Sequence, residues 1–183
     1  MQTTAIPDER HVMRKPIIFL ATALLAAGFH AAAAPQASAA GGPFWGELYT
    51  PVGPGTWYPA KCATPKGNST ANGTIITLWN CTGDELQKWD HDGYQIVHKA
   101  SGKCLTPQGD GYDVNGAVLT LWPCEEGGNN RSQQFWSSDW FMHAKFSDKC
   151  LTNKGGSSGN GTYLTLWTCA SDFPPEQHWQ MRY

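Results

Sequence analysis

One pattern is written three times along this chain of 183 residues, at offsets of 42 to 46 residues. Each copy contains a Lys-Cys pair, an Asn-Gly pair, a Thr-Leu-Trp triplet, a second cysteine and a closing Gln-x-Trp. Self-similarity with a period of about 20–50 residues is the signature of a repeat architecture. The pattern fills nearly all of the chain after residue 43, so it constrains the fold more than any other feature of the sequence.

The first forty residues lie outside the repeats. Basic residues precede an apolar stretch over 17–29, which is shorter than the roughly 20 residues of a membrane-spanning helix. Small residues follow and end in Ala37-Ser38-Ala39, the A-x-A pattern that signal peptidase cuts. The sequence therefore predicts a signal peptide over 1–40, cleaved near Ala39 or Ala40. It also predicts a secreted domain over 43–183 and no membrane span.

The charge and the cysteines narrow the class of protein. Without the leader, 10 Lys and Arg stand against 13 Asp and Glu, which leaves a formal charge near −3 and no basic footprint for nucleic acid. All six cysteines fall in the exported part, where an even count is typical of a disulfide framework. Of the fifteen possible connectivities, the repeat selects pairing within each unit: Cys62–Cys81, Cys104–Cys124 and Cys150–Cys169. Each such loop is worth about 3 kcal/mol.

Hydrophobic periodicity indicates strands and almost no helix. In the middle unit, short β-prone segments at 94–99, 103–106, 118–122 and 134–136 are separated by turn signals. The third segment of every unit alternates with a period of two, so its residues face two ways. We expect the aliphatic face to form the core: Ile76, Leu78, Leu119, Leu121, Leu164 and Leu166. We expect the other face to point outward, or half outward, beside the disulfide: Thr77, Trp79, Thr120, Trp122, Thr165 and Trp167.

A repeat that cannot close alone either stacks linearly or closes into a ring. Three copies without polar capping units favour the ring, and threefold closure of four-stranded units is an all-β β-trefoil. The predicted repeats cover about 43–91, 92–138 and 139–183. In the first repeat the opening strand is expected at 45–49 or 56–58, with irregular structure around the nearby prolines. The closing tryptophans are predicted to be core residues: Trp89, Trp136 and Trp179.

These residues resemble a known family. The order Lys-Cys-Leu, Asn-Gly, Leu-Trp-x-Cys and Gln-x-Trp is similar to that of the ricin B-chain-type lectins, also called QxW carbohydrate-binding modules. The resemblance covers about 43–183. It implies a β-trefoil with a shallow sugar pocket in each unit, where an aspartate after the first cysteine accepts sugar hydroxyls and an aromatic side chain stacks on the pyranose.

Carried over by position, the resemblance is only partly kept. The stacking aromatic is present three times, as Trp79, Trp122 and Trp167. The glutamine of Gln-x-Trp is assigned to Gln87, Gln134 and Gln177. Threonine stands at the aspartate position, as Thr64, Thr106 and Thr152, and two residues before the tryptophan, as Thr77, Thr120 and Thr165. Because an ionised acceptor forms stronger hydrogen bonds than a hydroxyl, the usual galactose mode is not expected.

One loop offers a replacement for the missing carboxylate. The segment before the Asn-Gly pair of the second unit contains Asp110, Tyr112 and Asp113, a combination that the other two units lack. We expect these residues to complete the pocket around Trp122.

No pattern in the chain predicts catalysis. G-x-S-x-G, H-E-x-x-H and phosphate-binding glycine loops are absent from the sequence, and every cysteine is assigned to a pair. The cysteine spacing is also far from that of zinc sites, so we expect neither a metal nor a cofactor.

Two hypotheses remain. The first is a secreted, stand-alone, monomeric lectin that binds a polysaccharide or cell-surface glycan through shallow tryptophan-based sites. The second is a trefoil with degenerate sugar sites that serves as a protein-interaction module, such as a toxin subunit, an inhibitor or an adaptor.

Overall fold

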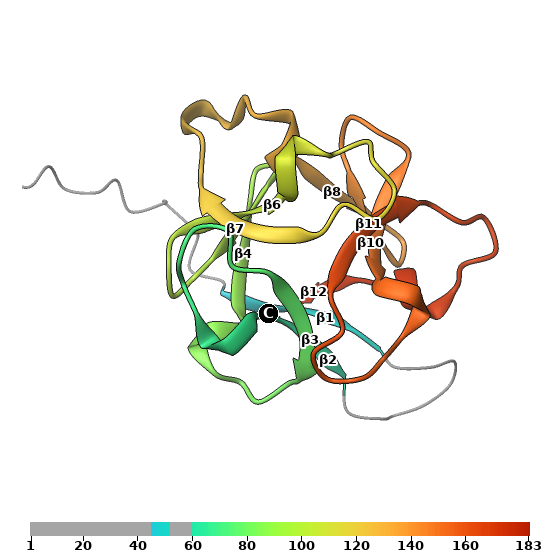
Figure 1. Ribbon diagram of the computed structural model, residues 1–183, viewed down its shortest axis with the longest axis horizontal. Coiled ribbons are helices and arrows are strands. Elements are labelled where there is room, and N and C mark those ends of the chain that lie inside the picture. Colours follow the sequence, from blue (N-terminus) through green and yellow to red (C-terminus); the bar gives the residue numbers. More distant parts are fainter. Residues whose placement is uncertain (1–44, 52–59) are drawn as a thin grey trace, which may run out of the picture. The chain divides into compact units, whose positions relative to one another are not determined.

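The computed structural model describes residues 45–51 and 60–183; the predicted signal peptide and the proline-rich stretch 52–59 lie outside the described residues (Figure 1). Within the described part, β strands and short 3-10 turns account for all regular structure, and no helix is long and apolar enough to cross a membrane. The strands are β1 Gly46–Thr50, β2 Lys61–Pro65, β3 Ile76–Asn80, β4 Lys88–Asp92, β5 Gln95–His98, β6 Lys103–Pro107, β7 Leu119–Pro123, β8 Phe135–Ser138, β9 Phe141–Ala144, β10 Lys149–Asn153, β11 Leu164–Thr168 and β12 Gln180–Arg182. The 3-10 turns are η1 Lys66–Asn68, η2 Glu85–Gln87, η3 Gln108–Asp110, η4 Glu126–Gly128, η5 Arg131–Gln133, η6 Lys154–Gly156 and η7 Pro175–Gln177.

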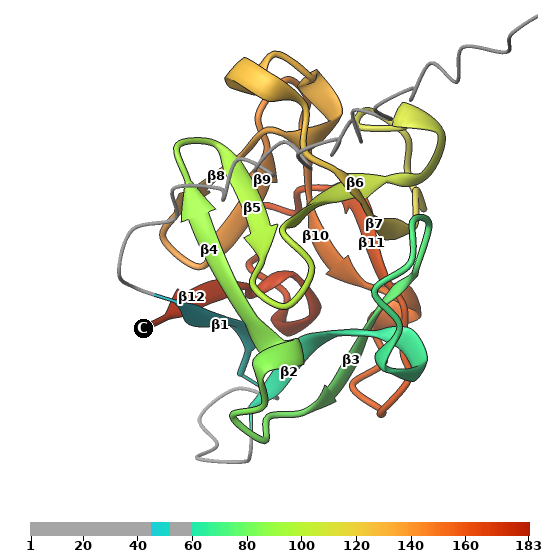
Figure 2. The same cartoon turned by 90° about the vertical axis from the view of Figure 1, so that its left-hand side faces the viewer.

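Six strands close into a barrel (Figure 2). Antiparallel ladders join β12 to β1, β1 to β4, β4 to β5, and β8 to β9. Single backbone hydrogen bonds close the two remaining gaps: Phe135 N donates to Tyr94 O at 2.7 Å, and Trp179 N donates to Trp140 O at 2.8 Å. The opening strand of the first repeat is therefore Gly46–Thr50, the earlier of the two predicted positions.

The other six strands form three hairpins, β2–β3, β6–β7 and β10–β11, which surround one centre in Figure 1. The Asn-Gly turn within each hairpin contacts the third strand of another repeat. Each turn makes one such backbone hydrogen bond, and the three bonds are equivalent, at 2.7–2.8 Å. They run from Gly73 N to Leu121 O, from Gly116 N to Leu166 O and from Gly161 N to Leu78 O. Because the last bond returns to the first repeat, the ring is closed, and the predicted β-trefoil is confirmed.

Each turn requires its glycine. The φ angles of Gly73, Gly116 and Gly161 are +78°, +84° and +84°. The N–H of the residue after the glycine bonds to the carbonyl three residues earlier, for example Thr74 N to Ala71 O at 3.2 Å. Glycine at positive φ in the third position of such a turn defines type II. The Asn-Gly pairs thus form turns, as predicted, and the turns hold neighbouring repeats together.

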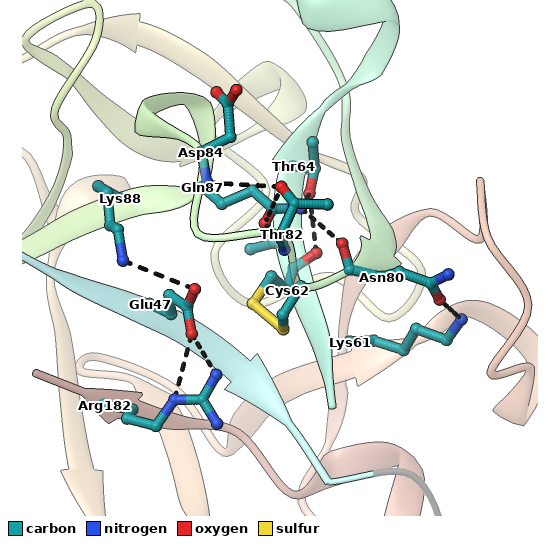
Figure 3. Close-up of a disulfide and its surroundings, with 12 residues drawn as sticks. Glu47, Lys61, Cys62, Thr64, Asn80, Thr82, Asp84, Gln87, Lys88 and Arg182 are labelled. Atoms are coloured by element: carbon teal, nitrogen blue, oxygen red, sulfur yellow. Dashed lines mark hydrogen bonds and ion pairs between the residues drawn. A yellow bond between two sulfur atoms is a disulfide. The ribbon is translucent and has the colours of Figure 1, made fainter. Parts of the chain in front are cut away.

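The core is shared by all three repeats. All six aliphatic residues of the predicted inner face are fully buried, and they pack with Leu48, Trp89, Leu105, Leu151 and Trp179. The three predicted disulfides are present, Cys62–Cys81, Cys104–Cys124 and Cys150–Cys169. One further contact joins the first and last strands: the buried Glu47 on β1 pairs with Arg182 on β12. Glu47 also pairs with Lys88 on β4, 3.6 Å away (Figure 3).

One prediction about the core is wrong. In the second repeat, Phe135 is fully buried at the position of Trp89 and Trp179, whereas Trp136 is 41% exposed. Consecutive residues of a strand face opposite sides, so β8 can bury only one of these two aromatics. The closing motif of this repeat is therefore Gln133-Gln134-Phe135, one residue earlier than the sequence reading placed it.

The burial of Phe135 in place of Trp136 generates a stability prediction. Replacing Phe135 by alanine should destabilise the domain by about 3–5 kcal/mol, because it empties a fully buried aromatic site. Trp136→Ala, the matched surface variant, should cost at most about 1 kcal/mol. Urea unfolding followed by fluorescence would measure both; similar losses for the two variants would contradict the assignment.

A buried histidine generates a second prediction. His98 Nε2 donates to Leu86 O at 3.1 Å, and Nδ1 lies 2.9 Å from the Ser101 hydroxyl, which can donate to it when the imidazole is neutral. Burial lowers the pKa of His98, the Leu86 carbonyl opposes this shift, and the charge of Lys103 adds to it. The unfolded chain therefore takes up this proton first, so stability should be complete above about pH 6.5 and fall as the pH drops below it.

One proton contributes at most about 1.4 kcal/mol per pH unit to that slope. His98→Gln, which keeps a donor for the Leu86 carbonyl, should flatten the dependence between pH 7.5 and 5. An unchanged slope, measured by urea unfolding at several pH values, would assign the acid sensitivity to other groups.

Candidate functional site

The third strand of each repeat presents an indole to the surface. Trp79, Trp122 and Trp167 are 47%, 43% and 50% exposed, as the alternation predicts. The threonines of the same face are instead buried, which corrects half of that prediction. Their hydroxyls donate to carbonyls of the partner strand, from Thr77 to Thr64 O, from Thr120 to Thr106 O and from Thr165 to Thr152 O, at 2.8–3.0 Å.

A hydrogen-bonded threonine–glutamine pair, here called the clamp, accompanies each indole; Figure 3 shows that of the first repeat, Thr64 and Gln87. In the first repeat, the Thr64 hydroxyl donates to Cys62 O at 3.0 Å and accepts from Gln87 Nε2 at 3.0 Å. Gln87 Nε2 also donates to Asn80 O at 2.9 Å, and its Oε1 accepts from Thr82 N at 2.7 Å. Both side chains are buried. Their hydrogen-bonding groups are thus largely used within the protein.

The clamp recurs with the same geometry in the other repeats. Gln177 bonds to Thr152, Thr168 O and Ala170 N. In the second repeat the clamp residue is Gln133, whose Nε2 donates to the Thr106 hydroxyl at 3.1 Å. The assignment of Gln134 to this position is wrong: its Nε2 donates to Gly128 O, and its Oε1 accepts from Lys145 at 3.3 Å.

A hollow opens over each clamp. The first hollow, about 500 Å³, has Thr64, Thr77 and Gln87 among its lining residues, together with Trp79 and Asp84. Gly161 from the turn of the third repeat also lines it. The second hollow, about 360 Å³, contains Thr106, Gln133, Trp122, Asp110 and Glu125; the third, about 750 Å³, contains Thr152, Gln177, Trp167, Asp172 and Glu176.

Two of the hollows include a turn glycine from a neighbouring repeat, Gly161 in the first and Gly116 in the third. A Cβ atom added to Gly73 would lie 3.8 Å from the ring of Trp122, and one added to Gly116 would lie 3.5 Å from the ring of Trp167. The turns that close the ring therefore also lie against the indoles of the second and third repeats, and an isolated first or third repeat would lack one lining residue of its hollow.

The three hollows differ in charge. Lys66 and Lys154 line the first and third, whereas Gln108 occupies the matching place in the second. Lys66 Nζ donates to the Tyr163 hydroxyl at 2.9 Å, and this bond lowers the pKa of the phenol. The second hollow thus has two carboxylates and no lysine among its lining residues.

Asp110 occupies a position with unusual backbone geometry. It adopts φ of +56°, and the equivalent residues Asn68 and Gly156 adopt +57° and +68°. Asn, Asp and Gly are the residues that tolerate this region best. The backbone is therefore conserved among the three hollows, while the side chain changes from an amide to a carboxylate to none.

The predicted loop residues are only partly brought together. Asp110 lines the second hollow beside Trp122, but Tyr112 and Asp113 are not among its lining residues. Sequence reasoning missed Asp84, Glu125 and Asp172. A signal for Asp84 existed, because Asp84 precedes Gln87 by three residues and its carboxylate caps η2 by accepting from Leu86 N at 2.8 Å.

No cluster in the described residues offers a complete metal site. His143 Nδ1 lies 3.3 Å from Cys150 Sγ and 3.4 Å from Cys169 Sγ, and Glu47 lies near Cys62 and Cys81. In both clusters the sulfurs belong to disulfides and cannot act as thiolate ligands.

Comparisons with known proteins agree with this geometry. The family model for the ricin-type beta-trefoil lectin domain matches residues 52–130 and 109–183. The designed threefold symmetric protein ThreeFoil is 20% identical, with a TM-score of 0.62 over 76% of this chain and 98% of that one. The C-half of the earthworm R-type lectin, solved in complex with GalNAc, is 15% identical, with a TM-score of 0.61 over the same shares.

A local match links the chain to a bacterial protein. The probable lipoprotein EnvE of Salmonella typhimurium is 44% identical over 45 residues, which are 25% of this chain and 26% of that protein. The two family matches together cover most of the chain, and the similar solved structures have the same fold. The chain belongs to the ricin-type β-trefoil lectin domain family.

Proposed function

We propose that the chain is an exported, non-catalytic lectin that binds a polysaccharide or cell-surface glycan through its three hollows. One observation carries the proposal: every hollow combines a half-exposed indole with a loop carboxylate. The pairs are Trp79 with Asp84, Trp122 with Asp110, and Trp167 with Asp172.

The chemistry of these pairs suits a sugar. An indole offers a broad apolar face to the C–H face of a pyranose at little entropic cost. A carboxylate accepts hydroxyl donors through charge-assisted hydrogen bonds. Because Thr64 and its equivalents are committed to the clamp, the loop carboxylates supply this acceptor. A changed acceptor position argues for a mode of recognition different from that of the usual galactose pocket.

Three hollows on one body favour a repetitive ligand. A single shallow site binds weakly, whereas sites that engage the same chain raise the overall affinity by effective concentration. Exported location is supported by the three disulfides, which persist in oxidising compartments. The signal-peptide pattern in 1–40 and the local match to a probable lipoprotein point to the cell envelope or the exterior.

One observation favours the protein-interaction alternative. The family's aspartate is replaced by threonine in all three repeats, which would also follow if the sugar sites had decayed. A blank glycan array together with recovery of one protein in stoichiometric amount would support this alternative and refute the lectin.

The main test removes the indoles. We expect the Trp79→Ala, Trp122→Ala and Trp167→Ala triple variant to lose glycan binding by at least tenfold, because stacking contributes about 1 kcal/mol per site and the sites act together. Glycan arrays followed by calorimetry would measure it. Tyr94→Ala, which removes a 49% exposed aromatic outside the hollows, is the matched control. Equal binding by triple variant and control would refute the proposal.

A second test isolates the carboxylate of the second hollow. Asp110→Gly should weaken binding there by about 1–2 kcal/mol, since a charge-assisted bond is lost. Glycine accepts the positive φ, so folding should be unaffected. Asn68→Gly makes the same backbone change in the first hollow without removing charge. Both variants should be compared by titration in the Trp79→Ala, Trp167→Ala background; equal affinities would show that Asp110 does not contact the ligand.

A further inference from the structure

A second aromatic surface lies outside the three hollows. Six rings form a contiguous strip along the β8–β9 hairpin and on the two sides of η7, here called the aromatic strip: Trp136, Trp140, Phe141, His143, Phe173 and His178. Three of them are well exposed, with Trp136 at 41%, Trp140 at 47% and Phe173 at 50%. The first and third repeats have Asp90 and Gln180 at the position of Trp136, so the strip is not part of the threefold pattern.

The rings are ordered by mutual contact. Trp136 stacks on His143 with centroids 4.3 Å apart and planes 13° apart. His143 meets Phe141 at 5.7 Å, and Phe141 meets Phe173 at 5.1 Å. Burial lowers the pKa of His143, against the opposing effect of Asp139, so the imidazole is neutral near pH 7. The packing covers one face of the Trp136 indole and fixes its orientation.

Phe173 is held in a strained conformation. Its φ is +53°, which a bulky side chain rarely adopts, and its ring is half exposed. Strain of this kind persists at functional sites, where the surrounding structure enforces it. Burial does not explain why phenylalanine stands here, because its ring is half exposed. The turn does not explain it either, because glycine would adopt this φ with less strain.

The strip is continuous with the third hollow. Asp172 and Pro174 both line that hollow, and Phe173 between them packs on Phe141 of the strip. A ligand seated against Trp167 therefore has an adjacent path over Phe173 toward Trp136.

The strip favours a hydroxyl-rich ligand. Asp172 and Asp139 flank it, and Ser138 Oγ lies 2.9 Å from His143 Nε2. Carboxylates repel an anionic membrane surface, yet they accept hydroxyl hydrogen bonds. We propose that the third hollow and the aromatic strip together bind a linear, neutral oligosaccharide, the hollow holding the first two sugars and the strip stacking on those that follow. This inference rests on the proposed function and adds a preference for chains over single sugars.

The test compares chain lengths. Disaccharides and hexasaccharides of β-linked glucose, mannose, xylose and galactose are titrated against the Trp79→Ala, Trp122→Ala protein, which leaves only the third hollow. We expect the hexasaccharide of the recognised sugar to bind about tenfold more tightly than its disaccharide. Trp136→Ala with Phe173→Gly should abolish this gain and leave the disaccharide affinity unchanged. Glycine tolerates the positive φ, so the thermal midpoint should be preserved.

Phe146→Ala is the matched control, because it removes a 45% exposed ring that lies beside Arg131 and Lys145, outside the strip. Equal affinities for both chain lengths, or a gain that survives the double variant, would overturn the inference while leaving the lectin intact. Absence of binding by every sugar would overturn both. Sedimentation that shows a dimer lost only in the double variant would make a second copy the occupant and refute the oligosaccharide.

Discussion

The contact between each Asn-Gly turn and the third strand of another repeat is the constraint on which the rest depends. Leu78 donates its N–H to Thr162 O and accepts from Gly161 N, at 2.8 Å in each case, so both backbone groups of this residue are bound by the third repeat. Alternation along the strand then sends the leucine into the core and the adjacent tryptophan to the surface. Closure of the fold and exposure of the indoles thus have the same cause.

The threonine–glutamine clamp explains why the hollows can differ while the fold stays symmetric. Clamp residues are buried and spend their hydrogen bonds on strand and loop backbone, so changes there would leave buried polar groups unpaired. The side chains of the loops above the clamps are not constrained in this way. Asn68, Asp110 and Gly156 share one backbone conformation and present three different side chains. Variation in recognition is therefore confined to positions where it does not disturb folding.

The repeat was sufficient to predict the trefoil, the three disulfides and the buried leucines, because each follows from spacing or from a period of two. It did not place Asp84 or Asp172 beside the indoles, because loop residues follow no alternation that shows which side chains face the hollow. The sequence Gln133-Gln134-Phe135-Trp136 permits two alignments with the closing Gln-x-Trp, one that ends at Phe135 and one that ends at Trp136. The tryptophan in the other repeats favoured the second alignment, which is wrong. The Asn130 cap three residues before Gln133, like Asp84 before Gln87, distinguishes them.

The position of the closing motif in the second repeat, one residue before Trp136, also changes the surface. Gln133 and Phe135 keep the spacing of the clamp and the core aromatic, so the next residue faces away from the core, and here it is a tryptophan that is 41% exposed. Phe173 is a second departure from symmetry, from a separate loop, and Phe141 contacts it on the same side of the barrel. Both departures add an exposed ring to the aromatic strip, and the neighbours of Phe173 in sequence line the third hollow, as a binding surface extended along one direction requires.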